Sequence, residues 1–493
     1  NLTMQQRGLP ISYVVTAGNQ AQIGFADIGR AVLADPRVTA LGLHIEGMGD
    51  LRALERLSVA ARALGKSIVA IKAGRSEQAR AATISHTASL AGSDAGARAL
   101  LRRMGIAQVQ SLPVLLETLK ILHVTGPLKS NRLASMSCSG GEAGLIADAA
   151  LDHDIHFPPL TPGQQVKLRA ALGFSVKLAN PLDYNTHIWP DPDAMATTFS
   201  AMAGPDIALS MIVSDFPRAD RCDLTDWQSV ITAAATTKIN TQNPIAVVAT
   251  LPENMPVDVA DQLIGLGVVP LCGLQDALAA ASAAVDLGPG DAPKNPVLPP
   301  LAPNNAQLIC EHDAKSALSE HGVRAPGRSF VLTPAQAGDA AVQLGFPVVL
   351  KGTGVAHKTE SGAVILWLTT REQVVKAAQK MAGNGFLVEK MITGAICELL
   401  IGVVLDPAHG YVLTLAAGGT LTELLGDSAS LLIPASADEV RTTLNGLKIA
   451  RLLHGYRGAT PANIDAIVQA VMAVQAYVTA NHGRIQEVEI NPL

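Results

Sequence analysis

The chain has 493 residues, 37 of them Lys or Arg and 42 Asp or Glu, which gives a formal net charge of −5. This length corresponds to about three domains of ordinary size, and the absence of a basic surplus or basic stripe argues against nucleic-acid binding. Hydrophobic residues make up 48% of the chain and charged residues 16%, a composition that excludes intrinsic disorder.

The mean hydropathy of +0.27 requires a membrane protein to be considered. The longest apolar runs, such as Ile245–Leu251, have the length of a strand and fall short of the roughly 18 residues that cross a bilayer. Five scattered cysteines form no C-x-x-C pair, so we expect neither a disulfide framework nor a zinc site. Since no signal peptide is evident either, we expect a cytoplasmic protein.

Residues 1–128 and 129–286 both alternate short apolar runs with Ala-rich helical patterns. Such alternation is typical of βαβ units and parallel sheets, so we expect one parallel-sheet domain in each stretch. Strands are expected at Ile11–Val15, Ala40–Ile45, Ser67–Lys72, Arg132–Ser137, Ile207–Val213 and Pro244–Thr250.

Prolines and glycines crowd residues 287–303, which can hold neither a helix nor a central strand. We therefore expect a linker there. Residues 304–493 have a different pattern, with a helix expected at Ala306–His321 and strands at Pro347–Lys351 and Ala363–Leu368. This pattern predicts an α+β domain with a mixed sheet.

His86 lies in the run SHTASLAGSD, where every neighbour is small or hydroxylated. An imidazole nitrogen in such a loop is a candidate nucleophile. A histidine that is structural or merely exposed is the alternative interpretation.

Two turns that follow predicted strands are candidate phosphate sites. Gly18 and Asn19 form part of the first, and Ser139, Gly140 and Gly141 form part of the second. A helix N-terminus offers free N–H groups and partial positive charge to an anion, and glycine permits close approach of the backbone. Two such turns and the His86 loop together predict a phosphohistidine site.

Glu46 ends a predicted strand and is a candidate to orient the ring of His86. A solvated glutamate at a strand end is the alternative.

Lys351 ends another predicted strand and precedes a Gly-rich loop that contains His357 and Lys358. A lysine beside a flexible Gly-rich loop suits polyphosphate binding. At the C-terminal end, Glu489 and Asn491 share one face of a strand and offer oxygen ligands that suit Mg²⁺. An amphipathic edge strand would show the same pattern.

These motifs jointly resemble those of the NDP-forming acyl-CoA synthetases, the superfamily of succinyl-CoA synthetase and ADP-forming acetate–CoA ligase. The resemblance covers nearly the whole chain. It rests on SHTASLAGSD, SGGEAG, Asn180–Asp183, Lys351 with HKTESGAV, Glu398 with GVVLDPAHG, Gly418–Gly419, LHGYRG and EINPL.

The resemblance implies two flavodoxin-like ligase domains followed by an ATP-grasp domain. It makes His86 the phosphoryl carrier, steadied by Glu46. It implies that Mg²⁺ is held by Glu489 and Asn491, and that Glu389 lies at the adenine hinge. The residues that it assigns to ATP are Lys351, His357, Lys358, Glu389, Glu398 and Arg457.

The implied reaction joins a small carboxylic acid to coenzyme A. ATP phosphorylates His86, the phosphoryl group passes to the acid, and the CoA thiol captures the acyl phosphate. The family's N-terminal CoA-binding domain and a C-terminal aspartate of its metal site have no match in this chain. We therefore expect an unseen segment or a partner chain to supply them, and we expect a homo-oligomer.

The acyl substrate is the least defined part of this interpretation. Tyr184 and Trp189 follow Asn180 and Asp183 in a chain that is poor in aromatic residues, and they are candidates to line the acyl pocket. Such a pocket would favour an aromatic or cationic acid; ordinary core aromatics are the alternative. A lyase that acts through a transient CoA thioester and a non-catalytic nucleotide- or CoA-binding regulator are the alternative functions.

Overall fold

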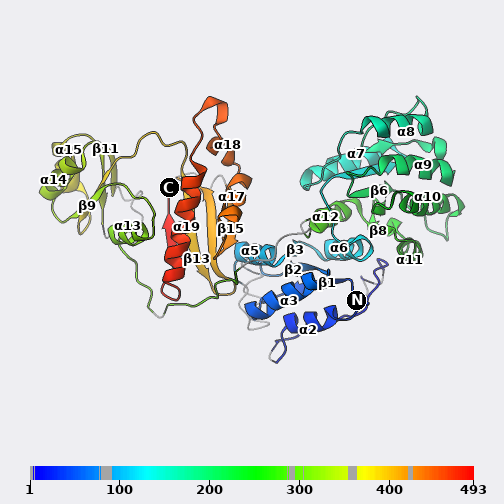
Figure 1. The fold of residues 1–493 in the computed structure, drawn as a ribbon, viewed down its shortest axis with the longest axis horizontal. Helices are drawn as coiled ribbons and strands as arrows, with labels where there is room; N and C mark the ends of the chain where they lie inside the picture. The colour runs from blue at the N-terminus through cyan, green and yellow to red at the C-terminus, as the bar shows by residue number, and fades with distance from the viewer. Residues whose placement is uncertain are drawn as a thin grey trace. The chain divides into compact units, whose positions relative to one another are not determined.

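The computed structural model describes residues 4, 6–20, 22–76, 78, 92–285, 287, 295–303, 305–353, 363–419 and 426–493. The chain divides into two compact units, Asn1–Lys294 and Asn295–Leu493, called here the N-terminal and C-terminal units (Figure 1). The division falls inside the predicted linker. Each unit is described by itself.

The N-terminal unit holds a three-stranded sheet in which all strands are parallel. The strands, in spatial order, are β1 (Ala40–Ile45), β2 (Ser67–Lys72) and β3 (Ile106–Val109). The helices that accompany them are α2 (Phe25–Leu33), α3 (Leu51–Ala63), α5 (Asp94–Met104) and α6 (Leu112–Thr125). Asp50, Ser93 and Ser111 begin α3, α5 and α6, because each side chain accepts a hydrogen bond from a backbone N–H of the first turn.

A second sheet of the same unit has five parallel strands in the order β5-β4-β6-β7-β8. Its strands are β4 (Leu133–Ser137), β5 (Leu182–Asp183), β6 (Leu209–Val213), β7 (Ile245–Ala249) and β8 (Val269–Cys272). Every residue of β4, β6, β7 and β8 is buried, as expected for parallel strands covered by helices on both faces.

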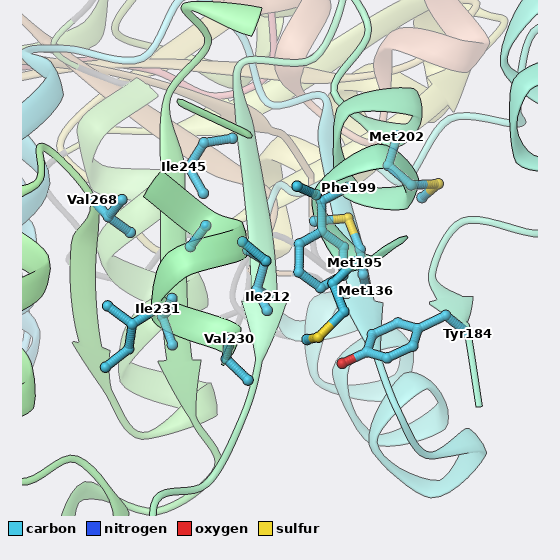
Figure 2. Packing of buried hydrophobic residues seen from close by; sticks show 14 of the residues in the cluster. Met136, Tyr184, Met195, Phe199, Met202, Ile212, Val230, Ile231, Ile245 and Val268 are labelled. Carbon is cyan, nitrogen blue, oxygen red and sulfur yellow. The ribbon is translucent and has the colours of Figure 1, made fainter. Parts of the chain in front are cut away.

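The helices of this second sheet are α7 (Gly140–Ala149), α8 (Pro162–Leu172), α9 (Pro192–Met202), α10 (Thr225–Thr241), α11 (Val257–Gly265) and α12 (Leu274–Val285). Short 3-10 turns lie at Ala150–Asp152, Thr186–Ile188, Pro252–Asn254 and, in the other unit, Tyr456–Gly458. Figure 2 shows part of the core, where Met136 of β4, Phe199 of α9 and Ile212 of β6 belong to one buried cluster.

The strand predicted at Ile11–Val15 does not form. Four of its apolar side chains are 40 to 55% exposed. A comparison with the second sheet explains this. The element order β1–α3–β2–α5–β3–α6 is the same as the order β6–α10–β7–α11–β8–α12. Ile11–Val15 precedes α2 and β1 in the way that β5 precedes α9 and β6, so it is the counterpart of β5. β5 pairs only with β4, and the described residues of the first sheet include no counterpart of β4. Without a neighbour for its backbone groups, the segment cannot join a sheet.

A buried ion network fastens the start of the chain to α6 and β8. Both Glu117 and Lys120 are fully buried, and Lys120 Nζ lies 2.8 Å from Glu117 Oε2. Arg7 Nη1 lies 2.8 Å from Glu117 Oε1, and the backbone N–H of Cys272 donates to Glu117 Oε2 at 2.9 Å. Glu117 therefore satisfies two cations and one buried N–H at once.

The described residues of the C-terminal unit form two four-stranded sheets, in which all the described strand pairs are antiparallel. The mixed sheet predicted for this part was therefore wrong. Short connections such as Pro407–His409 join neighbouring strands directly, whereas parallel strands require a long crossover. The strands, in spatial order, are β11 (Val364–Leu368), β10 (Val348–Gly352), β12 (Phe386–Lys390) and β9 (Arg328–Val331) in one sheet, and β15 (Ser428–Leu432), β14 (Gly410–Ala417), β13 (Leu399–Asp406) and β16 (Glu487–Ile490) in the other.

The helices of this unit are α13 (Glu311–Glu320), α14 (Pro334–Leu344), α15 (Arg371–Lys380), α17 (Ala437–Gly446), α18 (Ala450–Leu453) and α19 (Ile464–Ala480). α13 begins later than predicted, at Glu311, and places Glu311 and Asp313 in its first turn, where acidic side chains favour a helix start. The end of the predicted linker is packed: Val297 is buried, and Leu298 N–H donates to the carbonyl of Ile433.

Across the described ranges, none of the helices combines the length and apolarity needed to cross a membrane.

We predict that Glu117→Ala lowers the free energy of unfolding of the N-terminal unit by about 3–5 kcal/mol, because it removes the carboxylate beside the buried ammonium of Lys120 and leaves Arg7 only the more distant carboxylate of Asp276, at 3.7 Å. Urea unfolding of the full chain measures this. Glu253→Ala, at an exposed glutamate of the same unit, is the control and should change little. Equal effects of the two substitutions would contradict the importance of the network.

Candidate functional site

Three predicted residues, His86, His357 and Lys358, lie outside the described residues. Their roles therefore stay predictions.

Glu46 follows β1 directly, at the carboxyl end of the first sheet. Its backbone carbonyl accepts a hydrogen bond from Lys72 Nζ at 2.8 Å, and the same ammonium donates to the carbonyl of Ala73 at 2.5 Å. The buried Lys72 thus ties the ends of β1 and β2 together and places a positive charge beside Glu46.

The first predicted phosphate turn does not open a helix. Gly18 and Asn19 lie ahead of α2, whose N-cap is Gly24. Instead, Gln20 Oε1 accepts the N–H of Phe25, the first residue of α2, at 3.0 Å. The sequence pattern was misleading because α2 begins only at Phe25.

The second predicted turn has the expected geometry. β4 ends at Ser137, and α7 begins at Gly140 with Ser139 as its N-cap. Ser139 Oγ accepts the N–H of Gly141 at 3.2 Å. The strand order changes direction between β4 and β6, and the crevice at the carboxyl ends of such strands is the usual ligand site of an open α/β sheet.

Three carboxyl groups come together at this end of the sheet. Glu142 lies in the first turn of α7, Asp183 ends β5 and Asp215 follows β6. A Cβ atom on Gly140 would lie 3.0 Å from Asp183 Oδ2, so the carboxylate of Asp183 crowds the turn. Asp215 is held by Thr250, whose N–H and hydroxyl donate to it at 2.7 and 2.6 Å.

Glu142 was not singled out from the sequence, although it lies inside the SGGEAG motif. Burial, followed by the negative charges of Asp215 and Asp183, raises the pKa of Glu142 to about 7. Its Oε2 atom is buried and has no hydrogen-bond partner within the described structure. A neutral Glu142 would leave less negative charge at the α7 N-terminus, and an anion would then bind there more favourably.

The predicted acyl-pocket residues have different environments. The amide of Asn180 is occupied by backbone: it accepts from Ser135 N–H and donates to the carbonyls of Leu133 and Pro158. Asn180 therefore holds β4 in place. Of the four, Asp183 is one of the three carboxyl groups described above.

Tyr184 is 1% exposed, and its ring packs edge-on against Phe199 at 5.4 Å (Figure 2). This enclosed ring favours the alternative interpretation of Tyr184, an ordinary core aromatic. Trp189 is half-buried and packs edge-on against Trp227 at 5.7 Å.

In the C-terminal unit, the structure brings the predicted residues Lys351 and Glu389 together. Lys351 Nζ lies 2.7 Å from Glu389 Oε2 and 2.6 Å from Glu311 Oε1. Lys315 Nζ lies 2.5 Å from Glu389 Oε1 and 2.9 Å from Glu311 Oε1. Burial alone would lower the pKa of Lys351, but Glu311 and Glu389 outweigh it and hold that pKa above its usual value.

Glu398 and Asn491 meet at a glycine pair. Gly419 N–H donates to Asn491 Oδ1 at 2.9 Å, and Gly418 N–H donates to the carbonyl of Glu398 at 2.7 Å. Gly419 has φ +79, and a Cβ atom there would collide with the carboxylate of Glu398. A Cβ atom on Gly418 would lie 2.6 Å from the backbone carbonyl carbon of Leu399, so glycine is required there by close packing and at Gly419 by the positive φ.

The predicted metal ligands Glu489 and Asn491 lie at the solvent-exposed C-terminal end of the chain, and Glu489 pairs with Gly402 of β13. Their carboxylate and amide oxygens suit Mg²⁺. The part of the chain that the structure describes contains no group of three or more His, Cys, Asp or Glu side chains that could hold a metal ion. These two residues would thus supply part of a coordination shell.

Arg457 lies in an exposed turn with its guanidinium over the ring of Tyr456 at 5.3 Å. None of its described contacts is with Lys351.

The pKa of Glu142 predicts a pH-dependent stability. Glu142 holds its proton more tightly in the folded protein than its ordinary pKa of 4.5 would allow. Its contribution to stability is therefore fully present below pH 4.5 and is lost as the pH rises through about 7. We compare the Tm of Glu142→Gln with that of the natural chain at each pH. We predict that the difference, Glu142→Gln minus natural chain, is about 2–3 °C larger at pH 8 than at pH 4.5.

Thermal unfolding at the two pH values measures this difference, with Glu253→Gln as the exposed control. A Tm difference that is the same at both pH values would contradict the raised pKa.

Two family models match the chain. Residues 2–122 match the succinyl-CoA ligase like flavodoxin domain, and residues 302–493 match the ATP-grasp domain.

Similar curated proteins extend over almost the whole chain. A trans-feruloyl-CoA synthase from an unknown prokaryotic organism is 27% identical and covers 99% of this chain and 71% of its own length. The ADP-forming acetate–CoA ligase I of Archaeoglobus fulgidus is 25% identical, in a match that covers 99% of this chain and 73% of the length of that protein. The α subunit of the ADP-forming acetate–CoA ligase II of Pyrococcus furiosus is 32% identical over 35% of this chain and 37% of its own length.

These matches agree with the structure. The N-terminal unit has parallel sheets and a helix N-terminus where the strand order changes direction, and the C-terminal unit has antiparallel sheets and the Lys351–Glu389 ion pair. These matches confirm the resemblance of the chain to the NDP-forming acyl-CoA synthetase superfamily, which includes succinyl-CoA synthetase and ADP-forming acetate–CoA ligase.

Proposed function

We propose that the chain catalyses the ATP-dependent ligation of a carboxylic acid to coenzyme A, with acyl-CoA, ADP and phosphate as products. The observation that carries this proposal is the match to an ADP-forming CoA ligase over 99% of the chain. The relatives reported above are ligases and a synthase, which gives no support to the lyase or regulatory alternatives.

In the first step, an imidazole nitrogen of His86 attacks the γ-phosphorus of ATP, and the bond to the bridging oxygen breaks to release ADP. Lys351 would neutralise charge on the ATP phosphates from the end of β10. Glu489 and Asn491 would hold Mg²⁺, which supplies further charge neutralisation when bound.

In the second step, a carboxylate oxygen of the substrate attacks the phosphorus, and His86 leaves as free imidazole. In the third, the CoA thiolate attacks the acyl carbon and phosphate departs. The helix N-terminus at Ser139, Gly140 and Gly141 would bind the transferred phosphoryl group through its free N–H groups, and Glu46 would orient the imidazole. Division into these steps replaces one difficult condensation by easier displacements.

A partner chain would supply the CoA-binding part of the site, since one relative is named as a separate subunit. We further propose a homo-oligomer that acts in the cytoplasm, where its five free cysteines would stay reduced. For the substrate, we propose an aromatic carboxylic acid such as ferulate, because one relative is named a feruloyl-CoA synthase.

We predict that incubation with γ-labelled ATP and Mg²⁺ labels the protein with acid-labile, base-stable phosphate, as a phosphohistidine requires. His86→Ala should lose at least about 99% of this label, because the nucleophile is gone. His156→Ala, at an exposed histidine, should retain it. Subsequent addition of acid and CoA should discharge the label as phosphate and form a thioester.

An unlabelled protein that also forms no acyl-CoA with any acid of a broad panel, supplied with the CoA-binding part, would overturn the proposal. Label that persists in His86→Ala would assign the carrier to another residue.

A further inference from the structure

Four charged side chains alternate around the end of β10. The two ammonium groups belong to Lys315 and Lys351, and the two carboxylates belong to Glu311 and Glu389. Each ammonium lies within 2.9 Å of both carboxylates. Glu389 is 4% exposed, and the other three side chains are 20 to 24% exposed. We call these four residues the charge ring.

The charge ring is balanced by Lys315. Two carboxylates next to Lys351 alone would give this place a net charge of −1, which repels a polyphosphate. Lys315 brings the sum of the four charges to zero. At separations below 3 Å and with partial burial, each charge strongly affects the potential at its neighbours.

Lys351 keeps capacity for a ligand within this arrangement. An ammonium has three N–H donors, and two of those on Lys351 are directed at Glu311 and Glu389 within the described structure. The two carboxylates therefore fix the position of the ammonium and leave a donor for a phosphate oxygen.

Helix α13 supplies Glu311 and Lys315, one turn apart on the same face. The other half of α13 belongs to a different core: Leu318 is buried in the cluster that contains Val471 of α19. At the end of the helix, His321 packs edge-on against Tyr477 at 5.3 Å. The packing of α13 on α19 therefore sets the position of Glu311 and Lys315.

We propose that Glu311 and Lys315 are positioning residues of the nucleotide site, which hold the Lys351 ammonium in place and balance its carboxylate partners so that a nucleoside polyphosphate can bind. This inference rests on the proposed function, because it takes Lys351 as the contact for the ATP phosphates. Neither Glu311 nor Lys315 need touch the nucleotide.

The test is the affinity of the full chain for ADP and for ATP with Mg²⁺, measured by titration calorimetry. Lys315→Met leaves three charges with a sum of −1 and should raise both Kd values about tenfold. Lys315→Arg keeps the charge and should stay within about threefold of the natural chain.

The double variant Glu311→Gln/Lys315→Met decides between charge balance and simple packing. It retains the Glu389–Lys351 pair, whose charges sum to zero, so it should bind ADP more tightly than Lys315→Met does and return to within about threefold of the natural chain. If Glu311 and Lys315 acted only through packing, the losses of ADP affinity caused by the two substitutions would add. Glu320→Gln on the same helix and Lys376→Met on α15 are exposed controls and should bind normally.

Thermal unfolding checks that each variant is folded; where Lys315→Met is not, Lys315→Gln replaces it with the same expectation. Unchanged ADP affinity in the Lys315 variant, or a double variant weaker than the single one, overturns the inference. If ADP binding follows the expected order but no acid yields acyl-CoA with the CoA-binding part supplied, the proposed function fails while the charge ring stands. If the natural chain binds no nucleotide, both fail.

Discussion

The need of every buried strand for a hydrogen-bonded neighbour determines what this chain can build. In the five-stranded sheet, β4 pairs with β5 on one side and β6 on the other. The strand order therefore changes direction there, and the N-terminus of α7 opens into the resulting crevice. Ser139, Gly140 and Gly141 owe their position to this pairing. In the three-stranded sheet, β1 pairs with β2 alone among the described strands, and the apolar segment Ile11–Val15 stays exposed.

Both candidate phosphate sites contain more carboxylate than an anion-binding site would be expected to tolerate, and they compensate differently. At the α7 turn, Glu142, Asp183 and Asp215 crowd one another, and the pKa of Glu142 rises towards neutrality. In the C-terminal unit, Lys315 and Lys351 match Glu311 and Glu389 one for one. One site reduces its negative charge by retaining a proton, and the other supplies a second cation.

Local signals predicted the parts of the structure that local interactions determine. The step from β4 to α7 could be foreseen from the SGGEAG motif, because Ser139 is a cap and the glycines are a turn within a few residues. The strand predicted at Ile11–Val15 did not form, and the burial of Tyr184 could not be foreseen, because pairing and burial depend on distant parts of the chain. Glu311 and Lys315 were missed for a further reason: an i,i+4 Glu–Lys pair is usual on any exposed helix, and only the packing of α13 shows that it faces Lys351.

The two means of compensation imply different responses to pH. Lys351 remains charged throughout the neutral range, because its carboxylate partners hold its pKa above the usual value. The charge ring can therefore bind a polyphosphate, which is itself always strongly negative, without help from protons. Burial and the neighbouring carboxylates raise the pKa of Glu142 to about 7, so the α7 turn gains negative charge and binds a phosphoryl group less favourably as the pH rises. Of the two candidate phosphate sites, the α7 turn is therefore the one whose charge changes with pH in the neutral range.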